Sequence, residues 1–121
     1  MGKKILVVED NKDTRELFVC LLELNGFQVS QAIDGRSGLE TARVEKPDLI
    51  LTDINMPNMN GIDMIRILRS DPAFSDLPIL AVTAYGFDFG SEAVAAGASA
   101  QLRKPVEFEQ LTAKIQELLD K

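Results

Sequence analysis

Residues 47–61 read PDLILTDINMPNMNG, and this stretch decides the fold class. Its first part, residues 48–52, is a short and mostly apolar run, typical of strands that are buried on both faces of a sheet. Asp53 stands directly after that run, and the spacing of apolar residues predicts a helix over residues 58–70. A buried strand, a polar residue at its end and a returning helix form one unit of an α/β sheet.

The same alternation of strand and helix extends from this stretch to both ends of the chain. Asn11 can cap the first helix, Gly26 can end it, and Gly97 can end a later helix. Five alternations without a linker or repeat predict an α/β fold: a doubly wound parallel sheet with five helices on its two faces, in a single domain over residues 1–121. The predicted strands cover residues 5–8, 27–32, 48–52, 79–82 and 99–102.

Three of the helices carry apolar stripes, which predict the side that packs inward. In the helix over residues 58–70 the stripe consists of Ile62, Ile65 and Leu68. Cys20 lies beside the stripe of the first helix, so we expect a buried structural thiol there. The stripe of the first helix consists of Leu17, Phe18, Leu21 and Leu24, and that of the last helix of Phe108, Leu111, Ile115, Leu118 and Leu119.

Composition and charge exclude several classes of function. The chain of 121 residues has 45% hydrophobic and 26% charged residues, the mix of a globular domain, and its net charge of −6 disfavours direct binding to DNA or anionic lipid. No apolar run approaches the ~20 residues of a membrane span, and we expect a cytoplasmic protein. The chain has 0 histidines, which excludes any mechanism that needs an imidazole of its own.

Charged and hydroxyl side chains follow the predicted strands at their carboxyl ends. Glu9 and Asp10 follow the first strand, Asp53 the third, Thr83 the fourth, and Lys104 lies just beyond the fifth. Open parallel sheets bind ligands beyond these ends, so the side chains are expected to meet at one edge. Each alone could be a turn former, a helix cap or a solvated surface group. Three carboxylates together need a compensating cation, and oxygen ligands favour Mg²⁺.

The predicted site can carry phosphoryl chemistry without a histidine. Asp53 stands on the central strand and is the natural nucleophile, since carboxylates accept phosphoryl groups in covalent catalysis. Lys104 can neutralise one phosphoryl oxygen, and the Thr83 hydroxyl can donate a hydrogen bond to another. In-line transfer to a carboxylate depends on positioning and charge neutralisation far more than on a base.

Over nearly its whole length the sequence resembles response-regulator receiver domains of two-component systems, of the free-standing type found in chemotaxis and in cell-cycle or sporulation phosphorelays. The resemblance implies a flavodoxin-like fold with the strand order 2-1-3-4-5. It also implies a phosphoacceptor switch rather than an enzyme. The motifs that carry it are ILVVEDN at 5–11, PDLILT at 47–52, DINMPNMNG at 53–61, Thr83-Ala84 and Lys104-Pro105.

The resemblance implies a magnesium site with four ligands from the chain. Glu9, Asp10 and Asp53 would hold the ion directly or through water, and the backbone carbonyl of Asn55 would be a further ligand. Mn²⁺ would be able to substitute for Mg²⁺.

The resemblance also implies the roles in phosphorylation. Asp53 would be phosphorylated, Thr83 and Lys104 would bind the phosphoryl group, and Lys104-Pro105 would be a cis peptide. The donor would be a phosphohistidine on a sensor histidine kinase or a histidine phosphotransfer protein. The output would be phosphorylation-dependent binding to a downstream protein target.

The sequence departs from the family's pattern in the region expected to carry the signal. Gln101 stands three residues before Lys104, where the family usually has an aromatic residue that takes part in switching. One interpretation is that one or two of the aromatic residues after Thr83 pack under the fourth helix. Our hypothesis is that at least one is exposed and forms part of a partner surface on the fourth helix, fifth strand and fifth helix. The three aromatic residues are Tyr85, Phe87 and Phe89.

Two other interpretations are compatible with parts of the pattern. Phosphatases of the haloacid-dehalogenase type also place a nucleophilic Asp after a buried strand, but they need a second Asp two residues later, where this chain has Asn55. A pseudo-receiver, which binds partners without taking phosphate, would typically lack the acceptor, the lysine or one of the acidic pair. All of these residues are present here.

Overall fold

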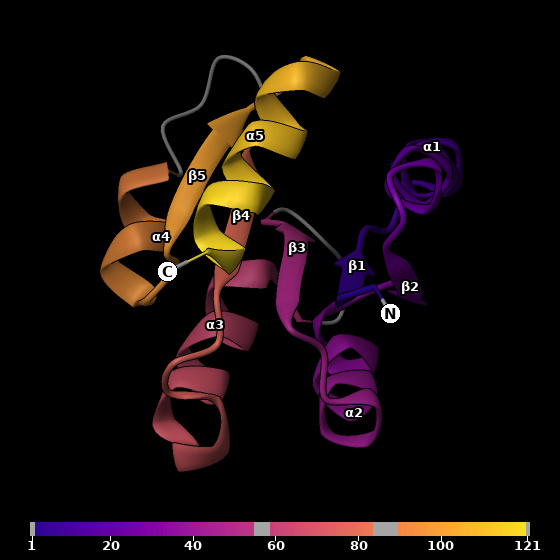
Figure 1. Cartoon of the computed structure of the whole chain (residues 1–121). Coiled ribbons are helices and arrows are strands. Elements are labelled where there is room, and N and C mark those ends of the chain that lie inside the picture. Colours follow the sequence, from indigo (N-terminus) through magenta and orange to yellow (C-terminus); the bar gives the residue numbers. More distant parts are fainter. Residues whose placement is uncertain (1, 55–58, 84–89, 121) are drawn as a thin grey trace.

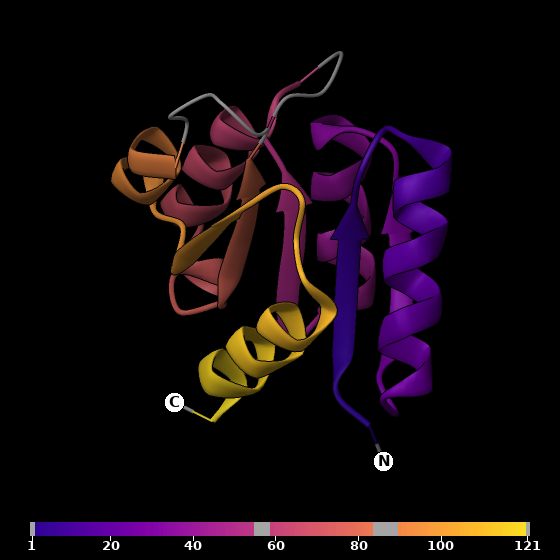
Figure 2. The same ribbon diagram turned by 90° about the horizontal axis from the view of Figure 1, so that it is seen from above.

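A computed structural model describes residues 2–54, 59–83 and 90–120. Five parallel strands form one sheet in the order β2-β1-β3-β4-β5, which confirms the predicted topology. The strands run towards one edge of the sheet, and both ends of the chain lie towards the opposite edge (Figure 2). The strands are β1 (Lys4–Val8), β2 (Gln28–Ala32), β3 (Leu49–Asp53), β4 (Ile79–Thr83) and β5 (Ala100–Arg103).

Helices cover both faces of the sheet (Figure 1). α1 and α5 share a hydrophobic core with Ile5 and Leu49, whereas α2, α3 and α4 share a second core with Leu6 and Ile50. Consecutive residues of one strand point to opposite faces, so the parts of β1 and β3 that the helices cover on both sides, residues 5–8 and 49–51, are apolar. The helices are α1 (Lys12–Leu24), α2 (Gly35–Glu45), α3 (Gly61–Ser70), α4 (Gly90–Ala96) and α5 (Phe108–Leu119), with a 3₁₀ turn at Pro72–Phe74.

Polar caps and glycines set the ends of the helices. The side chain of Asn11 caps α1, and that of Asp34 caps α2 in a capping box. The Asn60 side chain caps α3, so this helix begins at Gly61, three residues later than predicted. α4 ends before Gly97, whose φ of +123° suits a glycine. The predicted cap at Asn11 and the predicted stop at Gly97 are confirmed.

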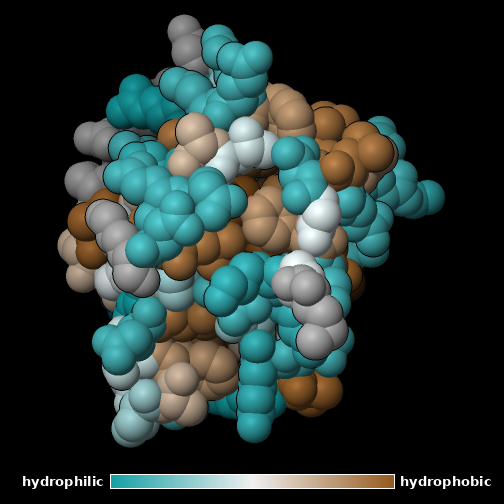
Figure 3. Space-filling model, in the orientation of Figure 1, coloured by the Kyte–Doolittle hydropathy of each residue, from teal (hydrophilic) through white to brown (hydrophobic). Residues whose placement is uncertain are grey.

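The predicted inward stripe of α1 is largely wrong. Phe18 and Leu22 are the buried residues of this helix, whereas Leu17 is 56% exposed and Leu24 is 78% exposed. Cys20 is also exposed, so the expected buried thiol is wrong as well. Each residue turns an α-helix by about 100°, which places Cys20 on the side opposite to both Phe18 and Leu22. Hydrophobic atoms are accordingly visible at the surface near α1 (Figure 3).

The stripe of α5 is confirmed at its centre and wrong at its start. Leu111, Ile115 and Leu118 are buried against the β1, β3 and β4 strands. Phe108, which was expected in the core, is 37% exposed. It is the first residue of α5 and lies before the part of the helix that packs on the sheet.

Candidate functional site

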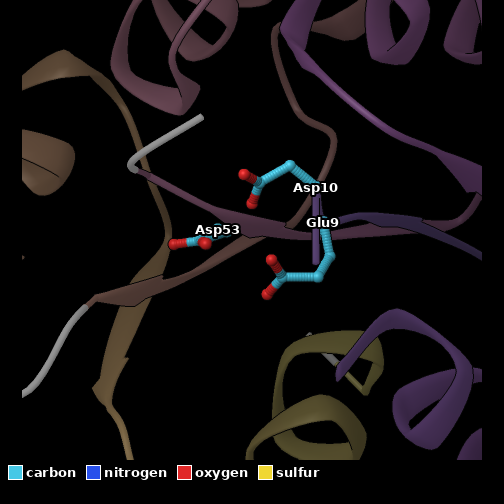
Figure 4. A group of neighbouring side chains, drawn as sticks. All are labelled: Glu9, Asp10 and Asp53. Carbon is cyan, nitrogen blue, oxygen red and sulfur yellow. The ribbon is translucent and has the colours of Figure 1, made fainter. Parts of the chain in front are cut away.

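The carboxyl ends of β1 and β3 bring three acidic side chains together. β3 ends at Asp53, one residue later than predicted, and Glu9 and Asp10 follow β1 directly. One carboxylate oxygen from each of these residues lies within 4.8 Å of the other two. Figure 4 shows Glu9 and Asp10 directed towards Asp53 on the neighbouring strand. The three carboxylates thus meet at one edge of the sheet, as the sequence led us to expect.

Lys104 adds a positive charge to this acidic cluster. It follows the last residue of β5, and its Nζ lies 3.0 Å from Glu9 Oε1 and 3.4 Å from Asp53 Oδ2. Glu9 is only 1% exposed and Asp53 is 8% exposed, so the ammonium pairs with two carboxylates that are shielded from water. The peptide bond from Lys104 to Pro105 is cis, as the resemblance implies.

Burial raises the pKa of the Glu9 carboxyl to about 7, and the charge of Asp53 acts in the same direction. Two donors oppose this shift: the Asn11 backbone N–H donates to Glu9 Oε2 at 3.1 Å, and the Lys104 ammonium donates to Oε1. Burial alone would lower the pKa of Lys104, but the Asp53 charge and the hydrogen bond to Glu9 raise it overall. The single ammonium of Lys104 therefore does not balance the three carboxylates of the cluster near neutral pH.

Hydrogen bonds fix Asp53 at the end of β3. Its Oδ1 accepts a hydrogen bond from the Ile54 backbone N–H at 2.7 Å, and the Thr52 hydroxyl donates to its backbone oxygen at 2.7 Å. The Gly61 N–H donates to the Ile54 oxygen at 2.8 Å, which joins the start of α3 to the end of β3. Oδ2 is the oxygen that faces Lys104.

Thr83 lies at the same edge of the sheet, at the end of β4. The residue is fully buried, and its hydroxyl is directed towards β5, 3.5 Å from the Leu102 carbonyl oxygen. At this distance the hydrogen bond is weak, which leaves the hydroxyl available to a stronger acceptor. The next strand carries Gln101 with an exposed side chain, at the position where the family usually has an aromatic residue.

Some of the predicted site lies outside the described residues. Asn55, the expected carbonyl ligand, is one of these, and so are the three aromatic residues for which we predict a partner surface. Those expectations stay predictions. The aromatic residues are Tyr85, Phe87 and Phe89.

Arg15 contacts the site but was not singled out from the sequence. It lies in α1, where its Nη1 donates to the Glu9 backbone oxygen at 3.0 Å and its Nε donates to the Gln31 side-chain oxygen at 3.2 Å. A single arginine on a polar helix face is usually a solvated residue, so no sequence pattern assigns Arg15 to the site.

The donor set fits a hard divalent cation. Carboxylate oxygens from Glu9, Asp10 and Asp53 are the ligand type that Mg²⁺ takes, and Mg²⁺ commonly keeps several waters beside one or two carboxylates. Asp10 is exposed, which would leave one side of such an ion open to water and to a substrate.

The raised pKa of Glu9 predicts a pH dependence of stability in the metal-free protein. In the unfolded chain this carboxyl titrates near 4.5, whereas in the folded state its pKa is about 7. The stability that this carboxyl contributes to the folded state is fully present below pH 4.5 and is lost as the pH rises to about 7. Between these values the carboxyl is protonated in the folded state but ionised in the unfolded chain, so raising the pH lowers the free energy of unfolding. At roughly 1.4 kcal/mol per pKa unit, we expect a loss of about 2 to 3 kcal/mol.

Urea unfolding between these pH values, in the presence of a chelator, measures this contribution. Glu9→Gln should lack it, so the difference in unfolding free energy between the two proteins should change with pH. An equal pH dependence in wild type and Glu9→Gln would contradict the assignment.

Comparisons with known proteins agree with this architecture. The family model for the response regulator receiver domain matches residues 5–116. The polar-differentiation response regulator DivK of Brucella anthropi is 32% identical over 120 residues, covering 98% of each protein. The chemotaxis response regulator CheY4 of Vibrio cholerae superposes with a TM-score of 0.90 at 30% identity, covering 98% of this chain and 99% of that one.

A third relative bears on the acidic cluster. The receiver domain of the sensor histidine kinase PA1611 from Pseudomonas aeruginosa, with a magnesium ion coordinated in its active-site cleft, superposes over 100% of both chains with a TM-score of 0.93 at 28% identity. Sequence, fold and acidic cluster lead to one assignment: this chain belongs to the response regulator receiver domain family.

Proposed function

We propose that this chain, residues 1–121, is a single-domain response regulator that accepts a phosphoryl group on Asp53 in a Mg²⁺-dependent reaction. A receiver domain is a phosphoacceptor switch rather than an enzyme. The observation that carries the proposal is the meeting of Glu9, Asp10, Asp53 and Lys104 at one edge of the sheet, with the Asp53 carboxylate on the central strand. These are the groups that phosphoryl transfer to a carboxylate requires.

Glu9, Asp10 and Asp53 would hold the ion, with the Asn55 carbonyl as a further ligand and Mn²⁺ as a substitute for Mg²⁺. When bound, the ion neutralises part of the negative charge that the carboxylates and the phosphoryl oxygens would otherwise bring together. The chain supplies the geometry: Glu9 is buried and fixed by Asn11 and Lys104, whereas Asp10 is exposed at the rim.

In the proposed transfer, an Asp53 carboxylate oxygen attacks phosphorus and the P–N bond to the donor imidazole breaks. The new P–O bond makes an acyl phosphate, and the imidazole leaves with the electron pair of the P–N bond. The leaving imidazole is neutral because the other ring nitrogen of the donor phosphohistidine carries a proton. Lys104 neutralises one phosphoryl oxygen, and the Thr83 hydroxyl donates to another after leaving the weakly bound Leu102 carbonyl. No group of the chain has to act as a base, which is consistent with its lack of histidine.

Family membership implies a histidine kinase as partner. The donor would be a phosphohistidine on a sensor histidine kinase or on a histidine phosphotransfer protein, and the output would be binding to a downstream protein target. We place this function in the cytoplasm, without direct DNA binding. The described ranges contain no helix with the length and hydropathy of a membrane span.

The proposal is tested by incubating the protein with acetyl phosphate, in Mg²⁺ or in excess chelator, and measuring its intact mass. We expect one added phosphoryl group in Mg²⁺ and none in chelator. A pseudo-receiver would take no phosphoryl group in either condition, and a phosphatase would turn over acetyl phosphate without a stable adduct.

A further inference from the structure

Arg15 holds the backbone between the two acidic residues that follow β1. Its Nη1 donates to the Glu9 carbonyl oxygen at 3.0 Å, and that oxygen belongs to the peptide bond that joins Glu9 to Asp10. The Nε of the same guanidinium donates to the Gln31 side chain on β2 at 3.2 Å. The planar fork of the guanidinium therefore links α1, the end of β1 and the edge strand of the sheet.

Asp10 depends on this backbone for its direction. Its carboxylate is exposed and makes no hydrogen bond or ion pair within the described part of the chain, so no polar partner orients it. Glu9, by contrast, is held by its own side chain, through Asn11 and Lys104. The peptide plane that precedes Asp10 is fixed on its oxygen side by Arg15.

We propose that Arg15 is a positioning residue, which aims the Glu9–Asp10 pair at the divalent cation without contacting it. The inference rests on the proposed Mg²⁺ site. Groups that orient metal ligands in this way typically change metal affinity by about 10- to 100-fold when they are removed. The exposed position of Asp10 places the expected effect at the lower end of that range.

The alternative role of Arg15 is purely electrostatic, and it has the opposite sign. A guanidinium next to three carboxylates repels a divalent cation, so removing it would strengthen Mg²⁺ binding if charge were its main contribution. Positioning predicts weaker binding after the same change. The sign of the effect therefore separates the two roles.

The experiment measures the Mg²⁺ dissociation constant by calorimetry or NMR titration, without a phosphoryl donor. Arg15→Met keeps the length of the side chain but removes its donors, and we expect about tenfold weaker binding. Arg15→Lys keeps the charge and a single donor nitrogen. Its Mg²⁺ affinity should lie between that of the wild type and that of Arg15→Met. The matched control is Arg43→Met, which removes the same charge from an exposed position. Arg43 lies about 12 Å along α2 from the first residue of that helix. This change should alter the Mg²⁺ affinity less than twofold.

Unchanged or tighter Mg²⁺ binding by Arg15→Met would overturn the inference. If that variant does not fold, Gln31→Ala tests the same point, because it removes the other anchor of the guanidinium; it should weaken Mg²⁺ binding by a few-fold, and an unchanged affinity would count against positioning. A wild-type protein that binds no Mg²⁺ at all would instead refute the proposed function. A wild type that binds Mg²⁺, with variants that bind equally well, would refute the role of Arg15 alone.

Discussion

Asp53→Asn is expected to reduce phosphorylation by acetyl phosphate to the background of the same protein incubated without acetyl phosphate. The amide oxygen of asparagine carries no negative charge and is a poor nucleophile, so the P–O bond does not form. The structure offers no substitute in the same position: Asp53 alone stands on the central strand, with Oδ1 fixed by Ile54 and Oδ2 facing Lys104. Intact mass after incubation in Mg²⁺ measures the result.

A loss of folding could mimic this result, so stability must be measured on the same variant. Asp53→Asn removes one of three clustered carboxylates, which relieves repulsion, and urea unfolding should show a stability at least equal to that of the wild type. Ser70→Ala, at an exposed position of α3, is a suitable control and should be phosphorylated normally. Wild-type phosphorylation of Asp53→Asn would mean that another residue is the acceptor.

Gly61→Ala is expected to destabilise the protein by about 3 kcal/mol, as overpacking of a closely packed site does. A Cβ at this position would lie 2.3 Å from the backbone oxygen of Asp53 and 2.9 Å from the Cα of Ile54. Both atoms belong to the backbone, so no side-chain rotation can relieve the collision. The start of α3 or the end of β3 has to move, and the second movement would displace the proposed acceptor.

Urea unfolding measures the loss of stability, and Mg²⁺ titration of the folded protein measures the displacement. Arg66→Ala, an exposed position in the same helix, should change the unfolding free energy by less than about 0.5 kcal/mol. If Gly61→Ala unfolds like the wild type and binds Mg²⁺ equally well, then the close approach of α3 to β3 is not a constraint on the site.

The acidic edge could be predicted because its geometry follows from topology. Parallel strands end at the same side of a sheet, so residues that are distant in the sequence, such as Asp10, Asp53 and Lys104, must meet once the strands are identified. That argument needs only the strand ends, and an error of one residue in the end of β3 did not affect it. The match between the predicted and observed strand order has the same origin.

The faces of α1 could not be predicted because the helix has too many apolar residues. Its sequence from Leu17 to Leu24 is LFVCLLEL, in which apolar residues occupy nearly every direction around the axis. Periodicity alone then allows several inward faces, and the packing of Phe18 and Leu22 against the sheet selects one. The contact of Arg15 with Glu9 depends on how α1 is rotated about its axis, so it could not be predicted from the sequence either.

The exposure of Cys20 gives the chain a natural attachment point for a probe. It is the only cysteine in the sequence, and a single thiol can be labelled without any substitution. Eight residues of α1, at about 1.5 Å each, separate it from Lys12, the first residue of the helix, which places a label roughly 12 Å along the helix from the end that adjoins the acidic edge. That spacing lies within the range of paramagnetic broadening and energy transfer. A partner that approaches the edge could therefore be followed from this position in the unaltered sequence.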